Sequence, residues 1–121
     1  PKAEQMFREA LQIKTKALGR KHPDAVKCIH SLMRITRLEK RYKEAELMGK
    51  EAVAERTRIF GINHPDTATS IYELALVYRD EGQKANALRL CKQAYSIKMN
   101  LLGESHPDAV RYRETLASIS R

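Results

Sequence analysis

The chain has 121 residues, of which 42% are hydrophobic and 31% are charged, and its formal net charge is +8. The length fits a single domain, and the apolar fraction is too high for a disordered chain. An apolar run of roughly 18 residues, which could span a bilayer, is absent, and two cysteines are too few for a disulfide scaffold.

A tripeptide recurs at a fixed interval along the sequence. His22-Pro23-Asp24, His64-Pro65-Asp66 and His106-Pro107-Asp108 follow one another at intervals of 42 residues. Other residues keep the same interval, namely Gly19, Gly61 and Gly103, Ala3, Ala45 and Ala87, Ala10, Ala52 and Ala94, and Leu32, Leu74 and Leu116. Self-similarity at a fixed period indicates an array of repeated structural units.

Each unit is predicted to form two helices. After His64 the apolar residues follow one helical stripe, which ends at Gly82. A second stripe follows and ends at Gly103, with Lys98 in its last turns, where a positive charge suits the helix dipole. The two stripes consist of Ala68, Ile71, Leu74, Ala75 and Tyr78, and of Ala87, Leu90, Cys91, Ala94, Ile97 and Leu101.

The His-Pro-Asp tripeptide is predicted to start helices. Proline suits the first helical position, the following Asp lies near the positive end of the helix dipole, and the His can cap the helix. The same tripeptide occurs in the J-domain of co-chaperones, but three copies at one period disfavour that interpretation. The three histidines lie in separate turns without a nearby His or Cys, so we predict no metal site.

The sequence therefore predicts an all-α fold of six helices. We expect a single repeat array over 1–121, made of a partial unit (1–21), two full units (22–63 and 64–105) and a partial unit (106–121). Both ends cut through a unit, which predicts a fragment of a longer array; a small complete bundle is the alternative. The expected helices are about Lys2–Leu18, Pro23–Lys40, Tyr42–Phe60, Pro65–Glu81, Lys84–Leu102 and Pro107–Ser120.

The unit resembles a tetratricopeptide repeat in its long, 42-residue form. Leu74-Ala75, Tyr78, Gly82 and the pair Ala87 and Ala94 stand where that pattern places them. Within this family, Ala10-Leu11-Gln12-Ile13 followed by Leu18-Gly19 and His-Pro-Asp is similar to the repeats of kinesin light chains. The resemblance implies a right-handed α-solenoid of antiparallel helix pairs. The chain departs from the light-chain pattern at two kinds of position. Lys40 replaces the turn Gly in the middle unit. The positions where the pattern has two adjacent Asn hold His30-Ser31, Tyr72-Glu73 and Glu114-Thr115.

A concave groove lined by the first helix of each pair is the predicted binding site. Arg34 and Arg37 lie one turn apart and are predicted to hold a carboxylate, with Tyr72 as a flat apolar contact. We therefore predict a non-catalytic scaffold that binds an acidic peptide or partner domain. The residues expected in the groove are Lys27, His30, Ser31, Arg34, Arg37, Thr69, Tyr72, Glu73, Leu76, Arg79, Asp80, Arg111, Glu114, Thr115 and Ser118.

Three other functions stay open. The charge of +8 suits a nucleic-acid-binding helical repeat, although the basic residues are dispersed and only 6% of residues are aromatic. The resemblance also allows a sensor or oligomerisation array of a signalling NTPase. Self-association through exposed end helices is the third, because Met6, Phe7 and Ile13 have no upstream helix to cover them.

Catalysis is not predicted. The glycines are scattered rather than gathered in a phosphate-binding loop, and each His-Asp pair belongs to a repeat turn. Cys91 lies in an apolar stripe and is expected to be buried, whereas Cys28 beside Lys27 is expected to be more exposed. We predict no cofactor, and the two reduced thiols favour the cytoplasm.

Overall fold

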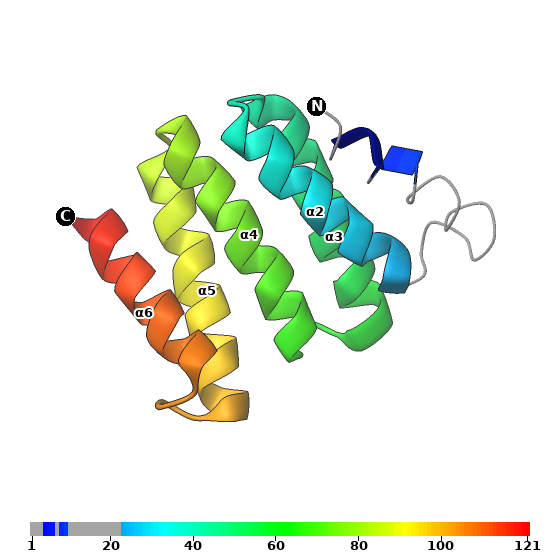
Figure 1. Cartoon of the computed structure of the whole chain (residues 1–121). Coiled ribbons are helices and arrows are strands. Elements are labelled where there is room, and N and C mark those ends of the chain that lie inside the picture. The colour runs from blue at the N-terminus through cyan, green and yellow to red at the C-terminus, as the bar shows by residue number, and fades with distance from the viewer. Residues whose placement is uncertain (1–3, 7, 10–22) are drawn as a thin grey trace.

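The structure, a computed structural model, describes residues 4–6, 8, 9 and 23–121, and residues 23–121 form five helices (Figure 1). Helix pairs follow one another along the chain: α2 packs on α3, α3 on α4, α4 on α5 and α5 on α6. The five helices begin and end within two residues of the predicted limits. They are α2 (Pro23–Leu38), α3 (Tyr42–Phe60), α4 (Pro65–Glu81), α5 (Lys84–Leu102) and α6 (Pro107–Ser120).

The first predicted helix lies mostly outside the described residues. Of its span, residues 4–6 and 8–9 are helical. They lie beside the start of α3, where Glu4 pairs with Arg41 and Arg8 pairs with Glu44. Met6 is 61% exposed, in agreement with the expectation that its side chain has no cover, whereas Phe7 and Ile13 lie outside the described residues.

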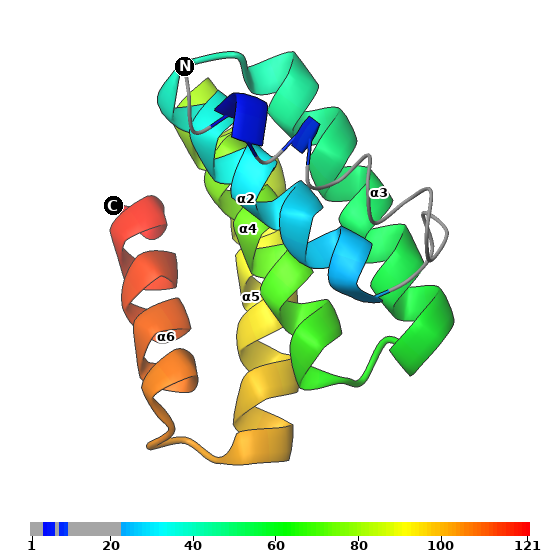
Figure 2. The ribbon, with the colours of Figure 1, turned by 45° about the vertical axis from the view of Figure 1, so that its right-hand side comes forward.

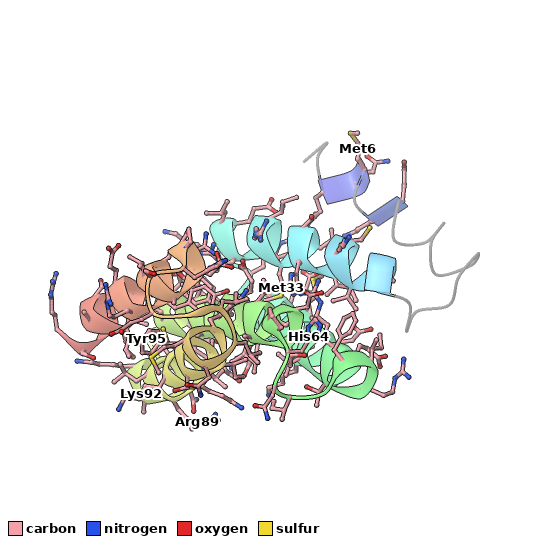
Figure 3. The ribbon with its side chains drawn as sticks, turned by 90° about the horizontal axis from the view of Figure 1, so that it is seen from below. Met6, Met33, His64, Arg89, Lys92 and Tyr95 are labelled. Carbon is pink, nitrogen blue, oxygen red and sulfur yellow. The ribbon has the colours of Figure 1, made fainter. Side chains whose placement is uncertain are left out.

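The first helices of successive units lie on one side of the molecule. α4 runs between α2 and α6 and is bonded to both, through Arg34–Glu73 on one side and Tyr72–Thr115 on the other (Figures 1 and 2). We call the surface made by α2, α4 and α6 the first-helix face. Arg89 and Lys92 of α5 lie at the opposite edge, away from α2 (Figure 3).

Small residues allow the helices to approach closely. The alanines that repeat at the 42-residue interval are fully buried in the described units, and they separate larger side chains contributed by neighbouring helices. The largest cluster joins α4, α5 and α6 and includes Ile71, Leu74, Leu90, Ile97 and Tyr112. The core is thus continuous from one unit to the next, as expected for a solenoid.

Two His-Pro-Asp copies cap their helices as predicted. His64 accepts a hydrogen bond at Nδ1 from the backbone N–H of Asp66 at 3.0 Å, and His106 accepts the equivalent bond from Asp108 at 3.1 Å. In both copies proline occupies the first turn of the helix. These bonds satisfy one of the free N–H groups at each helix start. His22, in the first copy, lies outside the described residues.

A buried cation ties each second helix to the helix that follows it. Arg56 and Lys98, which occupy the same repeat position, are only 6% and 4% exposed. Arg56 donates to the carbonyl oxygen of Asp66 at 2.8 Å, and the Lys98 ammonium donates to the Asp108 carboxylate at 3.0 Å. The hydrogen bond from Lys98 holds the pKa of Asp108 below its usual value. Lys98 therefore does more than complement the dipole of α5: it joins α5 to α6.

The turn between α2 and α3 holds a residue in the left-handed conformation. Lys40 has φ of 63°, whereas Gly82, its equivalent in the next unit, has φ of 90° at the end of α4. A side chain with a Cβ is strained there. We expect Lys40→Gly to raise the free energy of unfolding by about 0.5–1 kcal/mol, measured by urea denaturation. Lys40→Ala keeps the Cβ and is the control; an equal gain in both variants would contradict the argument.

Among the helices that the structure describes, none is both long and apolar enough to cross a bilayer.

Candidate protein-interaction face

The structure divides the predicted groove residues into exposed and buried groups. Lys27, Arg34, Arg79, Asp80, Arg111, Glu114 and Ser118 are exposed on α2, α4 and α6, and Ser31, Arg37, Thr69 and Thr115 are half-buried. His30, Tyr72, Glu73 and Leu76 are buried, with 6% to 9% of their surface exposed. The expectation that these four side chains face an open groove is therefore wrong. They lie between successive first helices, which contact one another directly.

Both arginines that were predicted to hold a partner's carboxylate already hold carboxylates of the chain itself. Arg34 donates to Glu73 at 3.0 Å, and Arg37 donates to Asp80 at 2.9 Å, so both arginines of α2 bind α4. The Arg37 side chain is only 15% exposed, and its role is to join the two units. The Arg34 side chain is 53% exposed above a Glu73 side chain that is 10% exposed. Arg34 thus keeps donors that face solvent.

A buried polar pair joins α2 to α4. The Nε2 atom of His30 lies 2.7 Å from the hydroxyl oxygen of Ser70. Burial, aided by the positive charges of Arg56 and Arg34, lowers the pKa of His30 to about 3. The imidazole is therefore neutral at neutral pH. Protonation of His30 would lower the stability of the contact between α2 and α4.

The equivalent contact between α4 and α6 is aromatic. Tyr72 occupies the repeat position of His30, and Tyr112 occupies that of Ser70. Their rings stack with centroids 3.8 Å apart, and the Tyr72 hydroxyl lies 2.8 Å from Thr115 Oγ1. The Arg111 guanidinium lies 5.5 Å from the centroid of the Tyr112 ring. Burial raises the pKa of Tyr112 to about 12. Tyr72 was predicted to offer the flat face of its ring to a partner, but in the structure this ring stacks on Tyr112.

Sequence reasoning missed the contacts between first helices. It assigned each helix one packed stripe and treated the opposite side as free, although α2 also packs on α4. A signal was available: Arg34 and Glu73 are 39 residues apart, and Arg37 and Asp80 are 43 apart, so opposite charges recur at close to one repeat length. Of the cations predicted to line the groove, Lys27, Arg34, Arg79 and Arg111 are exposed.

The two thiols are both free and buried. Cys91 is fully buried, as predicted, and burial raises its pKa to about 11. Cys28 is 7% exposed, so the expectation of an accessible thiol beside Lys27 is wrong: it points into the helix contacts while Lys27 points to solvent. Within residues 4–6, 8–9 and 23–121, no cluster of three His, Cys, Asp or Glu side chains could hold a metal ion.

Comparison with known proteins identifies the repeat type. A tetratricopeptide repeat family model matches residues 35–100, and a second one matches residues 1–24. The chain is similar to a solved structure from Podosopora anserina, described as "putative kinesin light chain nearly identical TPR-like repeats", with 26% identity and a TM-score of 0.88. It shares the fold of BtubC (BKLC) from P. vanneervenii, with 19% identity and a TM-score of 0.87.

These structures are longer than the chain. The match to the P. anserina protein covers 98% of this chain and 56% of that one, and the match to BtubC covers 96% and 46%. Among curated proteins, no sequence matches significantly. The family model covers more than half of the 121 residues, and the resemblance to kinesin-light-chain-like repeats is confirmed. The chain belongs to the tetratricopeptide repeat family, whose helical arrays serve as scaffolds for protein–protein interaction.

Proposed function

We propose that the first-helix face binds an acidic segment of a partner protein. The observation that carries the proposal is the position of the Arg34 guanidinium, which is exposed above a nearly buried carboxylate. Arg111 on α6 is likewise the more exposed member of an ion pair, formed within its own helix: its side chain is 60% exposed and its partner Asp108 is 30% exposed. On both helices the positive group is outermost, and the negative group that balances it lies deeper.

An arginine in such a pair can still bind a second carboxylate. The guanidinium carries five N–H donors, and the contact with Glu73 uses Nε and one Nη of Arg34. Lys27 lies on α2 two turns before Arg34 and is also exposed, which extends the positive surface along the helix. An extended acidic peptide would meet these cations in turn, and the attraction would weaken as salt is added.

The test compares charge removal on two faces. Fluorescence anisotropy of a labelled peptide rich in Asp and Glu is followed during titration with the whole chain, at low and at high salt. We expect Arg34→Gln with Arg111→Gln to weaken binding by about tenfold at low salt, because two charge-assisted contacts are lost. Arg89→Gln with Lys92→Gln removes the same charge from the opposite edge (Figure 3) and should leave the affinity within about twofold.

Two results would contradict the proposal. One is equal weakening in both double variants, which would mean that only net charge matters. The other is tighter binding of a mixed-sequence oligonucleotide than of the acidic peptide, with the same dependence on Arg34 and Arg111, which would favour the nucleic-acid alternative. Circular dichroism of each variant verifies that the helices are retained.

We also propose the repeat limits 22–63 and 64–105. Equivalent features support them: the His64 and His106 caps stand one interval apart, as do the buried cations Arg56 and Lys98. A partial unit at 1–21 and another at 106–121 complete this division. We place the protein in the cytoplasm because both thiols are free and buried.

A further inference from the structure

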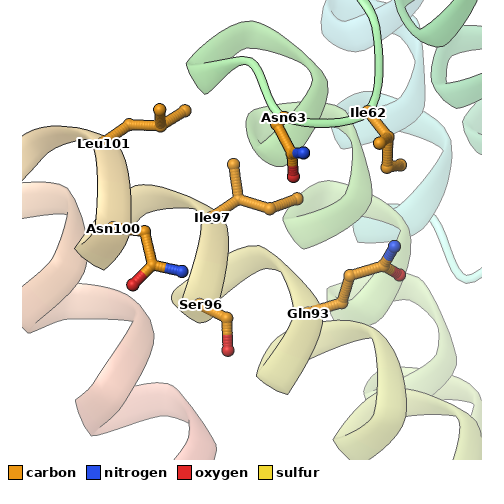
Figure 4. A pocket seen from close by; sticks show the side chains of 7 residues that line it. All are labelled: Ile62, Asn63, Gln93, Ser96, Ile97, Asn100 and Leu101. Carbon is orange, nitrogen blue, oxygen red and sulfur yellow. The ribbon is translucent and has the colours of Figure 1, made fainter.

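A second concave surface lies away from the first-helix face. It is a pocket of about 490 Å³ between the α3–α4 connection and the outer side of α5 (Figure 4). Ile62 and Asn63 form the wall on the connection, and Gln93, Ser96, Ile97, Asn100 and Leu101 form the wall on α5. The α5 residues recur at the spacing of one helical stripe and extend over about 12 Å. None of them belongs to the surface proposed above.

The pocket combines apolar and amide side chains. Ile97 is nearly buried and points toward Asn63, whereas Ile62 and Leu101 are 41% and 47% exposed at the rim (Figure 4). The polar side chains of Asn63, Gln93, Ser96 and Asn100 form no hydrogen bond with any part of the chain that the structure describes. Their donors and acceptors are therefore available to a ligand.

The chemistry of these groups selects the ligand. A carboxamide presents one acceptor and two donors, which match the C=O and N–H of a peptide bond. None of the lining side chains is charged or aromatic, so the pocket has no group to pair with a phosphate and no ring on which a base or sugar could stack. About four residues of extended chain span the length of the α5 wall.

The same side of the second helix carries charged residues in the preceding unit. Ile97 and Asn100 correspond to Glu55 and Arg58 of α3, which form an ion pair at 3.3 Å. Gln93 corresponds to Glu51. Three charged residues in one unit are thus replaced by uncharged ones in the next, and the pocket lies where the charges are missing.

We propose that this pocket binds an extended, uncharged stretch of a partner polypeptide. The amides of Asn63, Gln93 and Asn100 bond its backbone, and one apolar side chain of the partner packs on Ile97 between Ile62 and Leu101. A second copy of this chain is the less suitable occupant, because two chains of net charge +8 repel each other. The inference is independent of the first-helix face and stands even if no acidic peptide binds there.

Nuclear magnetic resonance detects such an interaction at low affinity. The whole chain, labelled with 15N, is titrated to millimolar concentration with a blocked peptide of Ser, Thr and Gly that has one central Leu. We expect the side-chain amide signals of Asn63, Gln93 and Asn100 to shift and to approach saturation. A peptide with Asp in place of Leu should shift them much less, because the apolar contact is lost.

The decisive variant gives α5 the charges of α3. Gln93→Glu with Asn100→Arg introduces the residues of the preceding unit at two exposed positions, without changing net charge. This double variant should weaken peptide binding by about tenfold, because the two introduced charges would be desolvated when the peptide binds. Ala85→Glu with Ala117→Arg adds the same charges at exposed positions outside the pocket and should have no effect.

Three results would overturn the proposal. The first is unchanged affinity in Gln93→Glu with Asn100→Arg. The second is the absence of any shift in the pocket at millimolar peptide. The third is a set of shifts confined to α2, α4 and α6, or dependent on protein concentration without peptide, which would place the contact on the other face or between copies. The Arg34→Gln, Arg111→Gln variant should bind this peptide normally, so failure of one proposal does not imply failure of the other.

Discussion

Replacement of Tyr112 by Ala is expected to lower the free energy of unfolding by about 3–5 kcal/mol, among the largest effects of any single substitution in this chain. Tyr112 is fully buried, and it is the largest side chain with no exposed surface in the described residues. Its ring stacks on Tyr72 of α4, and Lys98 of α5 and Arg111 of α6 lie 5.7 Å and 5.5 Å from its centroid. Removing it opens a cavity where three helices meet.

Urea denaturation of Tyr112→Ala measures this effect, and Tyr112→Phe is the matched control. Phenylalanine keeps the ring that stacks on Tyr72, so it should retain most of the stability, within about 1 kcal/mol. A loss of less than about 1 kcal/mol in Tyr112→Ala would mean that α6 contributes little to the fold. An equal loss in both variants would mean that the hydroxyl, not the stacked ring, is important.

Acid is expected to destabilise the protein through His30. Its pKa is about 3 in the folded state and about 6.5 in an unfolded chain. The unfolded chain therefore takes up a proton first, and the stability present above about pH 6.5 is lost as the pH falls toward about 3. At about pH 5 the expected loss is about 2 kcal/mol relative to neutral pH, at roughly 1.4 kcal/mol for each pH unit below 6.5.

Urea titrations at several pH values measure this slope. His30→Gln is the control because its side chain can still bond Ser70 but does not titrate; its stability should change little between about pH 6.5 and 5. Asp108 also loses its stabilising charge in acid, but its lowered pKa places that loss below the usual carboxylate range, at lower pH than the His30 effect. The same slope in the parent and in His30→Gln would show that His30 is not the cause.

The helices were predictable because they depend on local sequence. Proline at the first turn, a histidine cap before it and glycine after Glu81 act within a few residues, so the observed helix limits differ little from the predicted ones. The repeat interval then placed equivalent residues in equivalent contacts, and the buried alanines follow from it. Lys40 was recognised as a departure at the turn, and the structure shows that it adopts the glycine conformation.

The candidate site was less predictable because it depends on contacts between units. Helical periodicity describes one helix against one partner, whereas α4 contacts α2, α3 and α5. This is why His30, Tyr72 and Leu76 were expected at the surface and are buried. The pocket beside α5 was not expected either, since it requires the α3–α4 connection to lie over a helix that begins about twenty residues later.

The buried cations have a consequence for how such arrays lengthen. Each unit carries a buried cation near its end, and this cation bonds the start of the next unit: Arg56 bonds the backbone carbonyl of Asp66, and Lys98 bonds the carboxylate of Asp108. Duplication or deletion of any whole number of units leaves each buried cation next to the helix start of a following unit. A gene that gains or loses multiples of 42 codons therefore keeps these cation contacts, whereas the contacts between first helices, His30 with Ser70 and Tyr72 with Tyr112, differ between junctions and would be paired anew.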